Sequence, residues 1–480
     1  MARFAGCPCD KLIRPMEKTL LFEAFATLGK SERREFGKFV RSPFFNQKAQ
    51  PVALFEYLCD CHDARRAPNS TAAFERIWPG QAYDDQRMRL ANSELLGLLE
   101  HFWMYQEKFR DFDRAKIRLA AAYRKRNLHK HFQISLREAR VARERQPFRH
   151  AEFYHDLNLI EWEQYQFATA SKRTEHFNLQ EMSDLMDAEF AARKLRHVCF
   201  SLSHQAVFKT DYRFELLDAV LDYVQAGQRL DVPALALYYH CYRFLTNPAD
   251  EQHFFIFKEK LLTHAAAFPQ DELRILYLFA LNFGIKKCNE LVQPYFQETL
   301  ELYKSALELD LLLENGLLSR FAFNNIVAAA LRAGETAWAE DFIHRYRNFV
   351  EKKYRDVTYS LNLARVAYTR RDYKTALLHL QRADYKDLIN NLIAKTLQLK
   401  IFYELGEYDL LESHLASMKT YIRRQAGIGY HRTNYLNIVR YTQQLLQVNL
   451  NNTTMIAQLR QQIENEPVLT EREWLLAQSA

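Results

Sequence analysis

The stretch LARVAYTRRDYKTALLHLQRA, residues 363–383, decides the fold because its pattern returns along the chain. A second copy, LKIFYELGEYDLLESHLASM, follows at residues 399–418 and places Tyr408 35 positions after Tyr373. A weaker copy lies upstream at residues 334–343. A unit that recurs about every 34 residues and holds a turn in its middle is typical of helix pairs stacked one after another.

The composition of the chain supports the same architecture. Only 12 glycines and 12 prolines occur in 480 residues, and a β-rich chain needs turn residues about every 8–12 positions. Hydrophobic residues make up 48% and charged residues 26%, which indicates a folded chain and not a disordered one. We therefore expect an all-α fold, an α-solenoid of stacked antiparallel helix pairs.

The repeats resemble the tetratricopeptide family over about residues 321–421. The small residues that let paired helices approach closely in that family stand at Ala339, Ala364, Ala376 and Ala383. The family's turn aromatic stands at Tyr373 and Tyr408. Its closing proline is missing, and Leu411 and Met418 occupy positions of small residues in the last unit. These two larger side chains predict a wider helix crossing there.

In that family, the first helix of each pair lines a concave groove that binds peptides. By resemblance, the positions facing such a groove are Asn324, Arg332, Arg365, Tyr368, Lys400 and Tyr403. Arg365 and Lys400 occupy the same slot in successive units, as do the two tyrosines. A ladder of one cation and one tyrosine per unit suits an acidic peptide or a terminal carboxylate. The alternative is that these are ordinary solvated residues of amphipathic helices.

A second candidate surface lies in the basic segment, residues 108–149. It carries 14 lysines and arginines against four acids, whereas the whole chain has a net charge of +7. Its candidate phosphate-binding residues are Arg124, Lys125, Arg126, Lys130, Arg137 and Arg140. Neutralised phosphates would account for such a cluster in a nucleic-acid-associated protein. The other interpretation is a basic face that is solvated, or that docks against an acidic neighbour in the same chain.

Signals for an enzyme are missing from the sequence. It contains no H-E-x-x-H, Walker A, G-x-G-x-x-G or G-x-S-x-G motif. Two C-x-C pairs, at Cys7 and Cys9 and at Cys59 and Cys61, give the ligand count of a zinc site but not its usual spacing. We therefore expect no metal, no cofactor and no catalytic activity. The predicted function is that of a protein-interaction scaffold, with nucleic-acid binding as the alternative.

The chain divides into five parts by pattern: residues 1–15, a disordered or untranslated extension; 16–150, an N-terminal helical region with the basic helices; 151–315, an irregular array of helix pairs; 316–425, the tetratricopeptide-like repeats; and 426–480, a C-terminal helical cap. A helical pattern starts at Met16, so translation could begin there instead of at Met1. In the cap, Thr470 and Glu473 have the spacing of a capping box that opens a last helix to Gln478.

The N-terminal part resembles a group of large, uncharacterised bacterial proteins. The shared features are a Ser31-x-x-x-Glu35-Phe36 helix, a Ser42-Pro-Phe-Phe-Asn46 turn and a Trp78-Pro-Gly80 break. No apolar run has the length of a signal peptide or a membrane span. Seven cysteines in 480 residues do not form a disulfide framework. We expect a cytoplasmic protein without a membrane partner; the sequence leaves its oligomeric state open.

Overall fold

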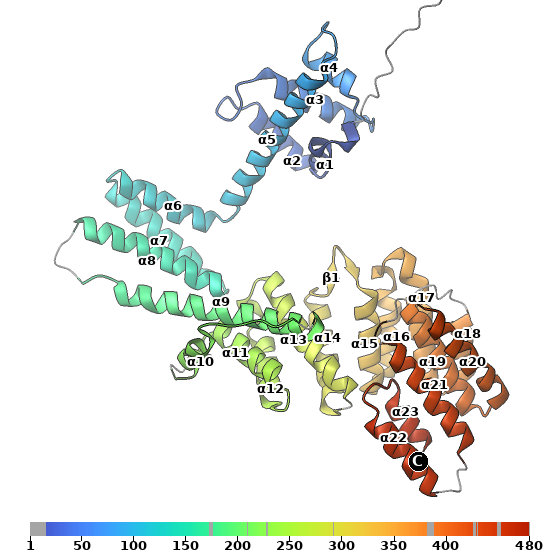
Figure 1. Cartoon of the computed structure of the whole chain (residues 1–480). Coiled ribbons are helices and arrows are strands. Elements are labelled where there is room, and N and C mark those ends of the chain that lie inside the picture. The colour runs from blue at the N-terminus through green and yellow to red at the C-terminus, as the bar shows by residue number, and fades with distance from the viewer. Residues whose placement is uncertain are drawn as a thin grey trace, which may run out of the picture. The chain divides into compact units, whose positions relative to one another are not determined.

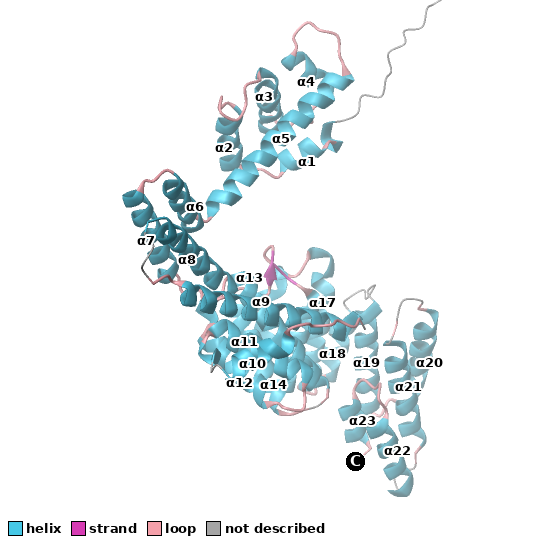
Figure 2. Ribbon diagram, turned by 60° about the vertical axis from the view of Figure 1, so that its left-hand side comes forward, coloured by secondary structure: helices cyan, strands magenta, loops and turns pink. Residues whose placement is uncertain are grey.

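The structure is a computed structural model that describes the following residues: 16–171, 176–208, 210–226, 229–290, 292–381, 388–425, 429, 431–448 and 453–479. The expected extension at residues 1–15, with Cys7 and Cys9, lies outside this described part, and so does Ala383. The described chain is almost entirely helical (Figures 1 and 2). No helix among these residues combines the length and the apolar character that a membrane crossing requires.

The chain folds into two compact units, which are described separately. The first unit comprises residues up to 146 together with 152–187, and the second comprises 147–151 and 188–480. The helices of the first unit are η1 (Met16–Lys18), α1 (Leu20–Ala26), α2 (Lys30–Val40), α3 (Ala49–Asp63), α4 (Ser70–Ile77), α5 (Asp85–Arg110), α6 (Phe112–Lys125) and α7 (His129–Arg145), with most of α8 (Ala151–Ser171) and the start of α9 (Leu179–Phe208).

Two apolar cores hold the first unit together. Helices α1 to α5 share one core, in which the Phe36 ring meets Phe55 and Phe102 at centroid distances of 5.4 Å. Helices α6, α7 and α8 share another, with Phe132 and Ile160 fully buried in it. The second core matters for function because it fixes α8 against the basic helices α6 and α7.

The second unit continues the chain as a longer row of helices. They are the rest of α9, α10 (Leu217–Ala226), η2 (Arg229–Asp231), α11 (Pro233–Thr246), α12 (Gln252–Thr263), η3 (Ala265–Ala267), α13 (Gln270–Asn289), α14 (Pro294–Glu308), α15 (Arg320–Arg332), α16 (Thr336–Tyr346), η4 (Arg347–Phe349), α17 (Lys352–Thr369), α18 (Tyr373–Gln381), α19 (Leu388–Glu404), α20 (Tyr408–Arg424), α21 (His431–Gln447), α22 (Thr453–Asn465) and α23 (Arg472–Gln478). A short hairpin, β1 (Leu313–Glu314) with β2 (Leu317–Leu318), stands between α14 and α15.

Consecutive helices of the second unit pack against each other. The pairs are α11 with α12, α13 with α14, α15 with α16, α17 with α18, and α19 with α20. The first helices of the last three pairs also touch along the row, α15 against α17 and α17 against α19. Ala339, Ala364 and Ala376 are fully buried where paired helices meet. This arrangement confirms the predicted all-α solenoid of helix pairs.

The turns between paired helices recur in one conformation. Gly334 and Gly406 follow the first helices of their pairs at φ 81° and 74°. The middle pair has Arg371 at the same place with φ 59°. Left-handed backbone suits glycine and is strained in a residue with a side chain. The repeat is therefore visible in the backbone even where the sequence lacks its glycine.

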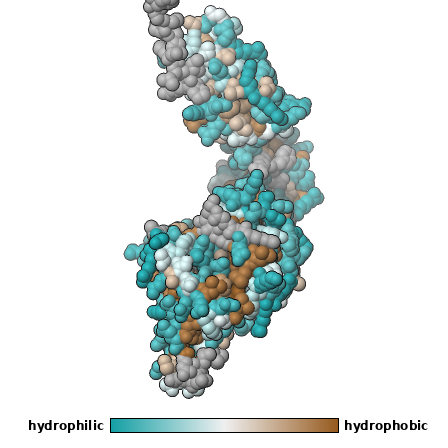
Figure 3. Space-filling view, turned by 90° about the vertical axis from the view of Figure 1, so that its right-hand side faces the viewer, coloured by the Kyte–Doolittle hydropathy of each residue, from teal (hydrophilic) through white to brown (hydrophobic). Residues whose placement is uncertain are grey.

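The surface of the C-terminal helices is mixed. Figure 3 shows apolar residues among hydrophilic ones on this end of the second unit. Large apolar side chains that are exposed on α18, α20 and α22 include Leu378, Leu410 and Met455. They lie on three different helices.

Candidate functional site

The six positions expected to face a groove lie on the first helices of three successive pairs. Asn324 and Arg332 are on α15, Arg365 and Tyr368 on α17, and Lys400 and Tyr403 on α19. Because α17 touches both α15 and α19, these side chains come from adjacent helices. We call Arg332, Arg365 and Lys400 the groove cations.

A row of asparagines fixes the three helices at one level. The Asn362 amide donates to the Asn324 side-chain oxygen at 2.7 Å, and the Asn324 amide donates to the Asn390 side-chain oxygen at 3.4 Å. Asn362 and Asn390 are almost fully buried. Buried amides that bond to one another specify how helices align. Asn324 is therefore part of a polar row that joins the three helices and is not an ordinary solvated residue.

Two of the groove cations donate to neutral oxygens. Arg365 donates to the Asn324 carbonyl at 3.2 Å and to the Asn362 side chain at 3.3 Å. Arg332 donates to the Cys288 carbonyl at 3.0 Å. Burial lowers the pKa of the Arg365 guanidinium below its ordinary value, which still leaves it charged at neutral pH because arginine starts so high.

The third groove cation reaches a carboxylate near the end of the chain. Lys400 Nζ lies 2.7 Å from Glu471 Oε2, and their side chains are 12% and 36% exposed. Burial by itself raises the pKa of the Glu471 carboxyl. The charges of Lys400, Arg332 and Arg365 outweigh it, so the pKa falls below its ordinary value. All three groove cations thus act on one carboxylate.

A second carboxylate of the groove is held by aromatic donors. Glu404 accepts hydrogen bonds from the Tyr368 hydroxyl, from the Tyr373 hydroxyl at 2.5 Å and from Trp474 Nε1 at 2.6 Å. Tyr403 packs edge-on against Trp474, with ring centroids 5.4 Å apart. Burial and this carboxylate raise the pKa of Tyr368 far above its ordinary value, which keeps the hydroxyl a donor.

The site therefore contains residues that the sequence patterns did not single out. Glu404, Glu471 and Trp474 complete it, and the last two come from the C-terminal segment, which we define as residues 466–479. The expected capping box does not form: α23 begins after Glu471, whose side chain makes no cap bond, and its φ is 55°. The only signal for these partners was chemical, an acid and a tryptophan near the chain end.

Two of the six candidate phosphate-binding cations are paired with acids inside the first unit. Arg124 lies 2.8 Å from Glu163, and Arg140 pairs with Glu161. Both acids are on α8 and are nearly buried. The other four candidates are exposed and have no carboxylate partner among the described residues. They are Lys125, Arg126, Lys130 and Arg137.

Asp156 of α8 binds two further arginines of the basic segment. Its carboxylate lies 2.6 Å from Arg114 Nε and 3.0 Å from Arg143 Nη2, and its side chain is 1% exposed. Burial raises the pKa of Asp156, although both arginines act against that change. The basic segment thus docks against an acidic helix of its own chain, one of the two interpretations that the sequence left open.

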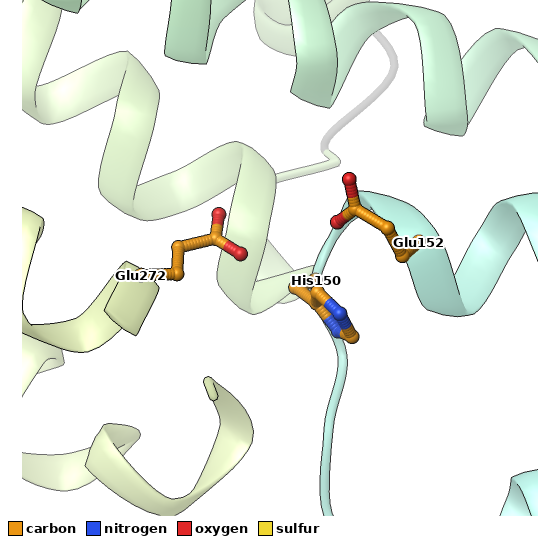
Figure 4. A group of neighbouring side chains, drawn as sticks. All are labelled: His150, Glu152 and Glu272. Atoms are coloured by element: carbon orange, nitrogen blue, oxygen red, sulfur yellow. The ribbon is translucent and has the colours of Figure 1, made fainter. Parts of the chain in front are cut away.

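One group of side chains in the second unit brings metal-ligating atoms together. His150 and Glu272 place ligand atoms within 4.8 Å of each other (Figure 4). The Glu272 carboxylate is already engaged, by Arg196 at 3.3 Å and by the Tyr238 hydroxyl at 2.6 Å. A carboxylate compensated in this way is a poor ligand, so we assign no metal to this group.

The C-x-C pair on α3 does not have the electrostatics of a metal ligand. Cys61 is buried and Cys59 is partly buried. Burial, with nearby acids, raises the pKa of the Cys59 thiol to about 11, whereas zinc binds the thiolate.

In comparisons with protein-family models, curated proteins and solved structures, nothing matches the chain. The class of protein therefore follows from the fold alone. The described residues form a helical repeat-like chain with contacts between consecutive helices.

Proposed function

We propose that this chain is a non-catalytic protein-interaction scaffold in the manner of tetratricopeptide repeats, and that the groove on α15, α17 and α19 binds an acidic peptide or partner helix. One observation carries the proposal: Lys400 pairs with Glu471 at 2.7 Å, and the charges of Arg332 and Arg365, from the two preceding repeats, help to lower the pKa of the same carboxyl. Charge-assisted hydrogen bonds in a partly dry site favour an acidic ligand.

The remaining donor capacity of the groove supports the same ligand class. Arg332 and Arg365 donate to neutral oxygens within the described part of the chain. A guanidinium bonds a carboxylate more strongly than a carbonyl, and often with two parallel bonds. A ligand with more than one carboxylate would therefore gain contacts that the protein alone does not supply.

Affinity purification with the full chain tests the proposal. The variant Arg365→Glu/Lys400→Glu reverses two groove cations, and we expect it to lose the partners that wild type captures. The control is Arg423→Glu/Arg424→Glu, a reversal of two exposed arginines on α20 that keeps the same net charge. Circular dichroism shows whether each variant is folded. Identical partner sets for wild type and a folded groove variant would refute the assignment.

A second candidate function rests on the first unit. The four exposed cations Lys125, Arg126, Lys130 and Arg137 keep no carboxylate partner among the described residues, and exposed cations of this kind neutralise phosphates. This proposal predicts RNA or DNA binding that weakens linearly on a log-log salt plot. Absence of binding at about 50 mM salt would exclude it. The described free thiols suit a reducing cytoplasm for either function.

A further inference from the structure

The C-terminal segment of the chain contacts the candidate groove positions on α19. Within the C-terminal segment, Glu471 pairs with Lys400, and Trp474, only 7% exposed, donates to Glu404. Lys400 Nζ also stands 4.6 Å from the Tyr368 ring centre and 6.0 Å from that of Trp474. Two side chains three positions apart at the start of a helix therefore fill both polar centres of the groove.

We propose that the C-terminal segment is an internal ligand of the groove, and that an external partner displaces it with a helical segment of the same chemistry: an acidic residue followed three positions later by a tryptophan, with at least one further carboxylate. This inference rests on the proposed function and adds two things to it. It names the chemical class of the partner, and it makes the free chain self-inhibited.

The charge balance of the groove explains why an external ligand can win. Of the three groove cations, only Lys400 pairs with a carboxylate in the described part of the chain, that of Glu471. The other carboxylate, Glu404, is held by three neutral donors. A partner with a second acid could pair with Arg332 or Arg365, each of which now bonds to a neutral oxygen. The internal ligand thus forms fewer ion pairs with the groove cations than a ligand with two acids could form.

The local structure of the segment also favours release. Glu471 enters α23 from the left-handed region, at φ 55° and ψ 32°, which is strained for a residue with a side chain. Helix α23 has only 7 residues and is too short to persist without its contacts. Residues before it are anchored separately, since Asn437 donates to the Val468 carbonyl at 2.8 Å. Release can therefore stop at about residue 469.

The apolar contacts of α23 oppose release of the C-terminal segment. Leu475 is fully buried and shares a core with α21 and α22. Being attached to the chain, the segment also competes at an effective concentration in the millimolar range. In the free protein, most molecules should therefore keep the C-terminal segment bound. An added peptide can bind only the small fraction of molecules from which the segment is released.

A binding titration with a peptide of the chain's own sequence tests the inference. The probe is the fluorescently labelled peptide EPVLTEREWLLAQSA, residues 466–480, and the proteins are the full chain and its variant Glu471→Gln/Trp474→Ala. We expect the variant to bind the peptide at least tenfold more tightly than wild type, because its own segment no longer competes. The same peptide carrying both substitutions is the control ligand and should bind neither protein.

Matched variants show whether the peptide occupies the groove. Adding Arg365→Glu/Lys400→Glu to the open variant should abolish binding, whereas adding Arg423→Glu/Arg424→Glu should preserve it. Equal affinity of wild type and open variant would overturn self-inhibition and leave the proposed function standing. No binding to a folded open variant would overturn the partner chemistry, while partner capture by affinity purification judges the proposed function independently.

Hydrogen exchange covers the case in which the open variant does not fold. Wild-type chain is measured with and without excess unlabelled peptide 466–480. We expect the amides of residues 472–478 to exchange severalfold faster with the peptide present, because a displaced α23 loses its protection. Unchanged protection at saturating peptide would overturn the inference.

Discussion

The basic segment of the first unit and the groove positions of the second both gather cations, but their charges are compensated in different ways. In the basic segment, Asp156, Glu161 and Glu163 of a single helix neutralise four arginines. In the groove, the cations come from three helices and share one carboxylate. Four of the arginines that are dense in sequence are compensated by the next helix, whereas the cations spaced one repeat apart stand on adjacent helices. Spacing along the repeats, and not local charge density, indicated which cations would lie on adjacent helices.

The largest expected effect comes from removing the acid that neutralises the basic segment. Asp156→Ala removes the buried partner of both Arg114 and Arg143, whose side chain is 8% exposed, and leaves them to share Asp111, which is 40% exposed. Breaking a buried ion pair from one side costs about 4 kcal/mol, and chemical denaturation of the full chain should show this loss in the first unit's transition. Glu138→Ala removes a half-exposed partner of Lys116 and should cost less than about 1 kcal/mol. Equal losses would mean that Asp156 is not a structural neutraliser.

The stabilities of the two units should respond differently to acid. His240 is buried with its Nδ1 2.8 Å from that of His253, and burial lowers the pKa of His240 to about 4. The unfolded chain takes up this proton near pH 6.5, before the folded chain does, so the second unit loses stability as pH falls from 6.5 to 4. The loss approaches about 3 kcal/mol. The raised pKa of Asp156 acts with the opposite sign, because that group binds its proton more readily when folded.

Unfolding of the second unit measured between about pH 7 and pH 4 tests this prediction. His240→Gln should flatten its pH dependence, whereas the transition of the first unit should be unchanged by that substitution. A variant that keeps the full pH dependence would assign the acid sensitivity to other groups.

The sequence predicted the solenoid and the alignment of Arg365 with Lys400 on adjacent helices for the same reason. A repeat of about 35 residues places equivalent residues on adjacent helices, so Arg365 and Lys400 could be aligned from the sequence alone. Glu471 could not, since it lies 71 positions from Lys400 and is one of 59 acids. The capping-box spacing around it indicated a different role. Pairing of the basic segment was one of two open interpretations, because side-chain packing between α6, α7 and α8 decides it.

The basic segment and the groove should also differ in the strength of their individual ion pairs. Arg124 and Glu163 are 20% and 12% exposed, whereas Lys400 and Glu471 are 12% and 36% exposed. Double-mutant cycles with Arg124→Met/Glu163→Gln and Lys400→Met/Glu471→Gln should give a coupling energy of about 2 kcal/mol for the first pair. For the second we expect about 1 kcal/mol after screening by solvent. A stronger groove pair would argue against a displaceable C-terminal segment.

The smallest expected effect lies in the turns that set helix spacing in each region. Asn127 ends α6 at φ 59°, and Gly334 ends α15 at φ 81°. Gly334→Ala should destabilise the second unit by about 1 kcal/mol, because an L side chain is strained there. Asn127→Ala should lower the free energy of unfolding of the first unit by about half as much. Asparagine already has a side chain at this position, and it tolerates left-handed backbone better than most residues. Thermal unfolding of the two variants measures the difference. A larger cost at Asn127 would show that its side chain, and not the backbone conformation, holds the turn between the basic helices.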